Sequence, residues 1–232
     1  MAIEHNRLNP DALTPQNYTD YIGRYGREST NVPIMAGWTR DTRNSATRAS
    51  RGYLVHAGVE YGTPIGGSQY YKADVGARYY HAFTTDIVLA MRLQGGYGGG
   101  VGNKPYPVYK NYYVGGIGSV RGFEPNSLSP HDIKTGQPIG GSKMLTTTAE
   151  LKLPVPLPDG GNRLNAFTFV DGGNAWGAQG ASIASNGMRF SYGLGLAWNS
   201  PVGALKVSAG FPIGRKKFDR YQPFQMQFEA VF

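Results

Sequence analysis

Hydrophobic and polar residues alternate along most of the chain, which predicts β-strands with one apolar and one polar face. In the stretch 53–61, Tyr53, Val55 and Val59 share one face, while His56 and Glu60 lie on the other. The same period of two predicts strands at 34–39, 53–61, 71–79, 87–94, 144–153, 164–171, 188–198, 205–211 and 224–232. Residues 3–8 would add a tenth strand, and the polar segment that follows, 11–30, is expected to hold a short helix between Thr14-Pro15 and Gly26.

The two faces of these strands differ in a way that favours a membrane protein. Period-two alternation alone also fits a soluble sandwich or a lipocalin-like barrel. Here the apolar face keeps large side chains out to the strand ends, where Tyr and Trp gather as in an interfacial girdle. The opposite face is too polar for a packed core and suits an aqueous lumen; its charged residues are Lys72, Asp74, Arg78, Arg92, Glu150, Lys152, Asp171, Arg189, Lys206 and Glu229. The predicted fold is all-β, an antiparallel transmembrane β-barrel with about ten strands in this chain.

The composition agrees with that class. The 232 residues fit one large all-β domain, and the lack of cysteine excludes disulfides and thiolate metal sites. No run of eighteen or more apolar residues predicts a transmembrane helix. The net charge of +8 has its tightest cluster at Arg215-Lys216-Lys217, without a nucleic-acid-binding module, so no nucleic-acid partner is expected. Residues 1–5 lack the features of a signal peptide, which fits a protein that is not exported or an internal piece of a longer exported chain.

The regular alternation stops after Gln94 and resumes at Met144, which leaves a long loop at about residues 95–143. A structureless segment of that length inside a compact domain is uncommon and usually functional. Its centre, residues 115–125, holds Arg121 among glycines and apolar residues. We therefore expect the loop tip to make one specific polar contact through Arg121.

Catalytic chemistry has little support in the sequence. The four histidines fall in unrelated places without metal-ligand spacing, and neither a Gly-x-Ser-x-Gly elbow nor an HExxH pattern is present. The glycines at 95–102 do not complete a phosphate-binding GxGxxG between a strand and a helix. We predict that the protein is not an enzyme and has neither a metal site nor a cofactor.

Three motifs, in order along the chain, resemble those of the BamA family of outer-membrane assembly factors. The segment from Tyr109 through Val120-Arg121-Gly122-Phe123 is similar to the sixth extracellular loop of that family. Phe169-Val170-Asp171-Gly172-Gly173 resembles its Phe-x-Asp-x-Gly strand motif, of which Phe169 and Gly173 are the fixed ends. Ser200-Pro201-Val202-Gly203, followed by a last strand with an aromatic end, resembles its closing hairpin. The resemblance covers about residues 38–232.

That resemblance implies a site and a domain organisation. In the family the loop folds into the lumen, so the loop arginine, Arg121, is expected to pair with the inward-facing Asp171 and Glu150. The family barrel has sixteen strands and periplasmic POTRA domains. Residues 1–232 would therefore be the C-terminal part of the barrel domain, without POTRA domains or the first strands.

The resemblance also implies a function in the outer membrane of the Gram-negative envelope. The protein would be the barrel component of the machinery that folds and inserts other β-barrel proteins. Its lateral gate would be the closing strand, with Phe224, Met226, Phe228 and Phe232, whose unpaired amides can template a client strand. The implied partners are outer-membrane lipid, unfolded β-barrel clients and accessory lipoproteins of the assembly complex.

Two other functions fit the same sequence, because one fold can serve several. A transporter of the two-partner secretion type shares the Val-Arg-Gly-Tyr/Phe loop and passes an unfolded protein through its lumen. A structural or surface-binding barrel would use its exposed loops for interaction, and Arg121 would then be incidental to function.

Overall fold

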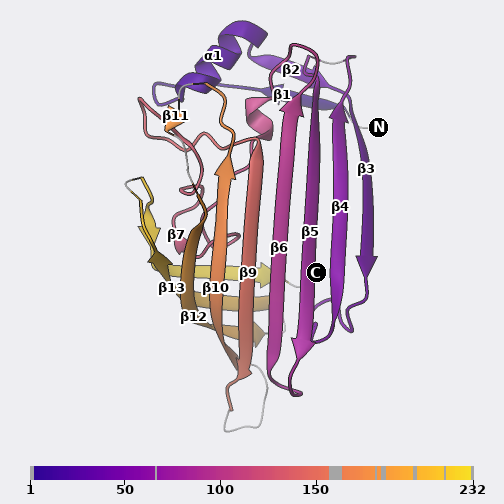
Figure 1. Cartoon of the computed structure of the whole chain (residues 1–232), viewed down its shortest axis with the longest axis vertical. Coiled ribbons are helices and arrows are strands. Elements are labelled where there is room, and N and C mark those ends of the chain that lie inside the picture. The colour runs from indigo at the N-terminus through magenta and orange to yellow at the C-terminus, as the bar shows by residue number, and fades with distance from the viewer. Residues whose placement is uncertain are drawn as a thin grey trace.

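The main body of the chain is one curved antiparallel β-sheet, seen in a computed structural model that describes residues 3–65, 67–156, 164–180, 182–183, 187–200, 203–216 and 218–230 (Figure 1). Its nine strands follow one another in the order β15-β13-β12-β10-β9-β6-β5-β4-β3, so strands that are neighbours in the chain pair side by side. The strands are β3 (Pro33–Asp41), β4 (Gly52–Gly62), β5 (Tyr70–Ala82), β6 (Val88–Gly100), β9 (Lys143–Pro154), β10 (Leu164–Trp176), β12 (Arg189–Ser200), β13 (Gly203–Ile213) and β15 (Phe224–Ala230). This arrangement confirms the predicted antiparallel barrel architecture.

The outer face of the sheet is apolar and open. Val59 on β4, Leu194 on β12 and Met226 on β15 are 57%, 62% and 71% exposed. Such a continuous exposed apolar surface is what a barrel presents to lipid. On the other face, Asp171 and Ser191 are buried, whereas Arg78 is exposed. The division of the strands into two faces is therefore as the alternation predicted.

The sheet has two free edges in the part of the chain that the structure describes. Strand β3 pairs only with β4, and β15 pairs only with β13. The edge of β15 runs along the last described residues, from Phe224 to Ala230. The nine strands thus form an arc of a barrel wall whose two ends each offer unpaired backbone groups.

The N-terminal residues lie outside this sheet, which corrects the prediction that 3–8 forms a tenth barrel strand. Strand β1 (Glu4–Arg7) pairs with β2 (Glu28–Asn31) in a separate two-stranded sheet. Figure 1 shows this pair and α1 (Gln16–Tyr25) at one end of the main sheet. At four polar residues, β1 is too short and too polar to span a bilayer.

Helix α1 begins after Pro15 and ends at Gly26, as the sequence predicted. Pro15 at the N-cap has no side chain that can accept a hydrogen bond, so the long loop supplies the acceptor. The backbone N–H of Gln16 donates to Asp132 Oδ1 at 3.1 Å. Among the described residues, no helix is both long enough and apolar enough to cross a membrane.

Strand β6 continues through the glycine-rich stretch to Gly100, so the loop begins later than the predicted residue 95. Glycine has no side chain to show an alternating pattern, yet its backbone pairs with β5 and β9. A Cβ at Gly96 would lie 2.5 Å from the Tyr112 ring, and one at Gly98 would lie 2.4 Å from the Tyr106 ring. The glycines therefore form the part of the inner wall against which the loop tyrosines pack.

The long loop, residues 101–142, holds little regular structure of its own. It contains the 3-10 turn η1 (Val108–Lys110) and two short strands, β7 (Gly122–Phe123) and β8 (His131–Asp132). These strands pair with β14 (Tyr221–Gln222) and β11 (Ser182–Ile183), which come from later in the chain. The loop is thus held mainly by contacts with other segments.

Candidate functional site

Arg121, at the loop tip, lies against two carboxylates of the inner wall. Its Nε and Nη2 donate to Asp171 Oδ2 and Oδ1 at 2.7 and 2.9 Å, and its Nη1 donates to Glu150 Oε2 at 2.7 Å. Its backbone N–H also donates to Asp171 Oδ2, at 3.1 Å. Asp171 comes from β10 and Glu150 from β9. Glu150 lies opposite Phe169, two residues from Asp171, so both carboxylates are on the same inner face of the sheet. The structure thus brings together the three charged residues that the sequence singled out.

Burial makes this contact more than a surface ion pair. Arg121 is 8% exposed and Asp171 1% exposed. A planar guanidinium can bind one carboxylate through two parallel bonds and still reach a second carboxylate, which a lysine cannot do. A buried charge of this kind is stable only while its partners remain in place.

Aromatic rings of β10 lie under the guanidinium. Arg121 Cζ is 3.5 Å from the centre of the Phe169 ring and 5.7 Å from that of Phe167. On β12, a Cβ at Gly193 would lie 2.5 Å from the Phe169 ring, so that glycine gives the ring its space. Phe169 of the strand motif therefore supports Arg121 from below by a cation–π contact.

The apolar residues beside Arg121 pack on the same wall. A Cβ on Gly173, the other end of the strand motif, would lie 2.7 Å from Val120 Cγ2. Val120 and Phe123 are fully buried, in one cluster with Val114, Leu128 and Ala175. The loop motif thus combines one ionic contact with a buried cluster of apolar side chains.

Gly122 brings the loop backbone into direct contact with β13. Its φ is +86°, and a Cβ there would lie 2.8 Å from the carbonyl carbon of Gly210. A Cβ on Gly210 would in turn lie 2.7 Å from the Gly122 nitrogen. Only a pair of glycines permits this approach without strain.

The loop motif also reaches the closing strand. The side-chain amide of Gln225 on β15 donates to the Phe123 carbonyl at 2.8 Å, and the Glu124 N–H donates to the Arg220 carbonyl at 3.0 Å. Phe224, Met226 and Phe228 of β15 point the other way and are exposed on the outer face. Phe232, the fourth residue predicted for the closing strand, lies outside the described residues.

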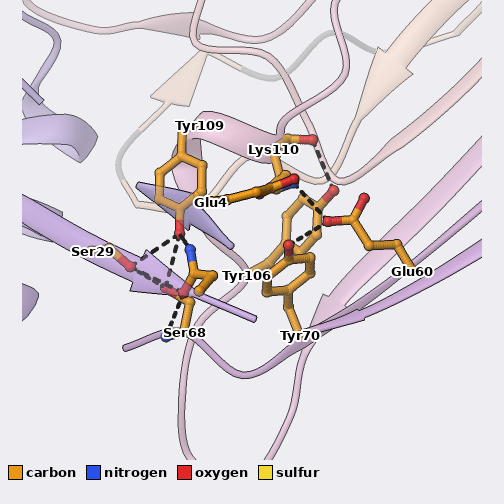
Figure 2. Close-up of polar contacts among 9 residues, drawn as sticks. Glu4, Ser29, Glu60, Ser68, Tyr70, Tyr106, Tyr109 and Lys110 are labelled. Atoms are coloured by element: carbon orange, nitrogen blue, oxygen red, sulfur yellow. Dashed lines mark hydrogen bonds and ion pairs between the residues drawn. The ribbon is translucent and has the colours of Figure 1, made fainter. Parts of the chain in front are cut away.

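A second polar cluster fixes the first part of the loop, and the sequence did not predict it (Figure 2). Lys110 Nζ donates to Glu4 Oε2 at 2.8 Å and to Glu60 Oε1 at 2.6 Å, and Tyr70 donates to the same Glu60 oxygen. Burial alone would lower the pKa of Lys110, but its hydrogen bonds to Glu4 and Glu60 raise it above the ordinary lysine value. Lys110 therefore stays charged and ties the loop to β4 and to β1.

Tyrosines extend this cluster. Tyr109 Oη accepts from Asn31 Nδ2 at 2.8 Å and lies 2.9 Å from Ser68 Oγ. Tyr112 Oη donates to Asp74 Oδ1 on β5 at 2.9 Å. These tyrosines belong to the lead-in of the loop motif, and their hydroxyl groups were the signal in the sequence for a second anchoring point.

We expect Lys110→Met to lower the free energy of unfolding of the full-length parent barrel by about 1–3 kcal/mol, because it leaves the Glu60 carboxylate half-buried without its cation. The shift of the folded band on a heat-modifiable gel measures this loss. Arg7→Met is the matched control, since the Arg7–Glu28 pair between β1 and β2 is exposed and 3.5 Å apart. Equal losses in the two variants would show that Lys110 does not anchor the loop.

In the part of the chain that the structure describes, no three His, Cys, Asp or Glu side chains gather in a group that could hold a metal ion. The geometry defines an antiparallel transmembrane barrel wall with a long loop that folds against its inner face and binds it through Arg121 and Lys110.

The chain belongs to the Omp85 superfamily, whose domain model matches residues 1–230. It is 30% identical to the outer membrane protein assembly factor BamA of Neisseria meningitidis serogroup B, over all of this chain and 34% of the relative. It is 33% identical to BamA of Nitratidesulfovibrio vulgaris over 81% of this chain and 24% of that relative. The crystal structure of BamA from Haemophilus ducreyi lacking POTRA domains 1–3 matches 96% of this chain, at 22% identity and a TM-score of 0.85.

The chain is thus an outer-membrane β-barrel chain of the Omp85 superfamily, with the fold of the BamA barrel. It spans about a third of the length of the Neisseria relative, 34%, and 49% of the Haemophilus structure. The match in fold extends over nearly the whole chain, and it includes the long loop as well as the strands.

Proposed function

We propose that this chain is the C-terminal part of the barrel of a factor that folds and inserts β-barrel proteins into the outer membrane. The observation that carries the proposal is the double attachment of the loop tip. Arg121 binds the wall strands β9 and β10, while Phe123 accepts a hydrogen bond from Gln225 of β15. The loop therefore braces, from inside, the strand whose other edge is unpaired within the described chain.

A braced edge strand is suited to receive a client strand. Unpaired backbone N–H and C=O groups on an edge are a template for strand addition, and main-chain hydrogen bonds supply the affinity. The brace keeps β15 in register with β13 while that edge stays open. On this proposal the closing strand, with Phe224, Met226 and Phe228, is one side of a lateral gate, and the Arg121 contact maintains its shape.

The remaining elements and partners belong to the same proposal. We infer that the other strands of a sixteen-stranded barrel, and the periplasmic POTRA domains, belong to the full-length parent. The partners would be unfolded β-barrel clients, accessory lipoproteins of the assembly complex and the surrounding lipid. No bond is made or broken in strand templating, so the proposed function is not enzymatic.

Photo-crosslinking of a stalled client tests this function in the full-length parent protein reconstituted in lipid vesicles. A benzophenone amino acid at Met226 on the edge strand is expected to capture an unfolded barrel client. The control is the same amino acid at Leu194, which is similarly exposed on the outer face but lies on β12 in the middle of the sheet. Equal capture at the two positions would contradict the templating role.

Crosslinking at a third position distinguishes the proposed insertion function from that of a transporter. Gln94 lies two residues after Arg92 on β6, so it is on the same, inward face of the sheet. Client capture that is strong at Gln94 and absent at Met226 would favour passage of an unfolded protein through the lumen, as in two-partner secretion. Capture at neither position would favour a structural or surface-binding barrel.

A further inference from the structure

Two arginines face each other on the inner wall beside the Arg121 contact. Arg78 of β5 and Arg92 of β6 are direct cross-strand partners. Arg78 lies four residues after Asp74 on β5, on the same face, and Asp74 accepts a hydrogen bond from the loop residue Tyr112. Arg92 contacts Thr148 of β9. Both guanidinium groups therefore lie on the lumen side of the sheet.

The pair has almost no partners in the described part of the chain. Arg92 Nη2 is 3.5 Å from Thr148 Oγ1, which is a long hydrogen bond, and Arg78 makes neither an ion pair nor a hydrogen bond there. Direct partners on adjacent strands have Cβ atoms about 4.5–5.5 Å apart, and like charges at that position destabilise the sheet. Each guanidinium carries five N–H donors, so most of the donors of this pair remain available.

The nearest acids are already committed to the loop. In the register, Arg92 lies opposite Thr148, and Thr148 lies opposite Asp171. Asp171 and Glu150, however, direct their oxygens at Arg121 at distances of 2.7–2.9 Å. In the described part of the chain, both carboxylates form their ion pairs with Arg121, and neither forms a direct ion pair with Arg78 or Arg92.

We propose that Arg78 and Arg92 form a binding site for an oxyanion, a carboxylate or a phosphate, on the lumen wall. The planar N–H fork of a guanidinium matches the geometry of such an anion, and arginine rings select anions in other pores. The anion would fill the unused donors and relieve the repulsion across the β5–β6 pair.

Thermal unfolding of the full-length parent in detergent tests this site, with inorganic phosphate as the probe. Phosphate is titrated against chloride at constant ionic strength, so that screening stays fixed. We expect the unfolding midpoint to rise by about 2–5 °C and to saturate, as binding to the folded state requires. Arg78→Gln and Arg92→Gln are each expected to abolish that rise.

The control is Arg40→Gln, since Arg40 lies on the outer face over Tyr53, with its Cζ 5.8 Å from the ring centre. This variant should keep the full phosphate response. A wild-type midpoint that does not respond to phosphate, or a response that survives in both Arg78→Gln and Arg92→Gln, would overturn the proposal. Arg78 is exposed, so Arg78→Gln is expected to fold even if the other variant does not.

A second ligand distinguishes the two sources of the oxyanion. A short peptide with two glutamates and blocked ends is titrated in the same way. A response to the peptide that both glutamine variants remove assigns the site to protein carboxylates, and a response to phosphate alone assigns it to phosphate. The readout is the stability of the folded barrel without any client, so its failure would leave the proposed insertion function untouched.

Discussion

Arg121→Ala is expected to lower the free energy of unfolding of the full-length parent barrel by about 3–5 kcal/mol, the usual cost of leaving a buried charge without its partner. The variant leaves the Asp171 carboxylate, which is 1% exposed, without its cation, and it also removes the cation over Phe169. Asp171→Ala should cost a similar amount for the opposite reason. Heat-modifiable gel migration of the barrel refolded in detergent, across a temperature series, measures both losses.

The double variant decides whether the two residues act as a unit. If Arg121 and Asp171 depend on each other, Arg121→Ala combined with Asp171→Ala should cost little more than either single change. Arg220→Ala is the control, because the Arg220–Glu124 pair is exposed and 3.9 Å apart, and we expect it to cost less than about 1 kcal/mol. Additive losses in the double variant would mean that the loop is not held through this ion pair.

Gly122→Ala is expected to undock the loop tip and to cost about 2–4 kcal/mol. Alanine at a φ of +86° is strained, and its Cβ would lie 2.8 Å from a backbone carbon of Gly210, which cannot move aside as a side chain could. The same gel assay reports the loss of stability. Trypsin cleavage after Arg121 should become faster, since the bond after this residue is buried while the loop is docked.

Gly118→Ala is the matched control in the same loop. A Cβ at Gly118 would meet no atom within 4 Å, and its φ lies outside the left-handed region. Its cost should be within about 0.5 kcal/mol of zero, and trypsin cleavage after Arg121 should be unchanged. A large effect at Gly118, or none at Gly122, would show that the close approach to β13 does not hold the loop.

The sequence predicted most of the wall, because the side-chain period of a strand decides which residues share a face. That rule alone put Asp171 and Glu150 on the inner face, and the family resemblance then gave Arg121 as their partner. The geometry of the three residues matches this expectation, with the guanidinium bonded to both carboxylates. Their roles in the assembly of client proteins remain a proposal.

Three features of the structure could not be predicted from the alternation of residues. Pairing of β1 with β2 depends on a contact across α1, and an alternation pattern carries no information on which segments meet. The boundary of β6 was missed because glycines show no face, although their backbone pairs as well as any other. Lys110 forms ion pairs with Glu4 and Glu60, which are far from it in the sequence and come close only in the folded chain.

The order of these contacts along the chain has a consequence for how the barrel itself is built. Every residue that receives the loop tip comes later in the sequence than Arg121, and the last of them, Gln225, is separated from Phe123 by 102 positions. Contacts over such a separation form late, because the intervening chain must first be ordered. We therefore expect the loop to remain outside its seat until β15 has paired with β13. A docked loop then indicates that the last strand of its own barrel wall has paired.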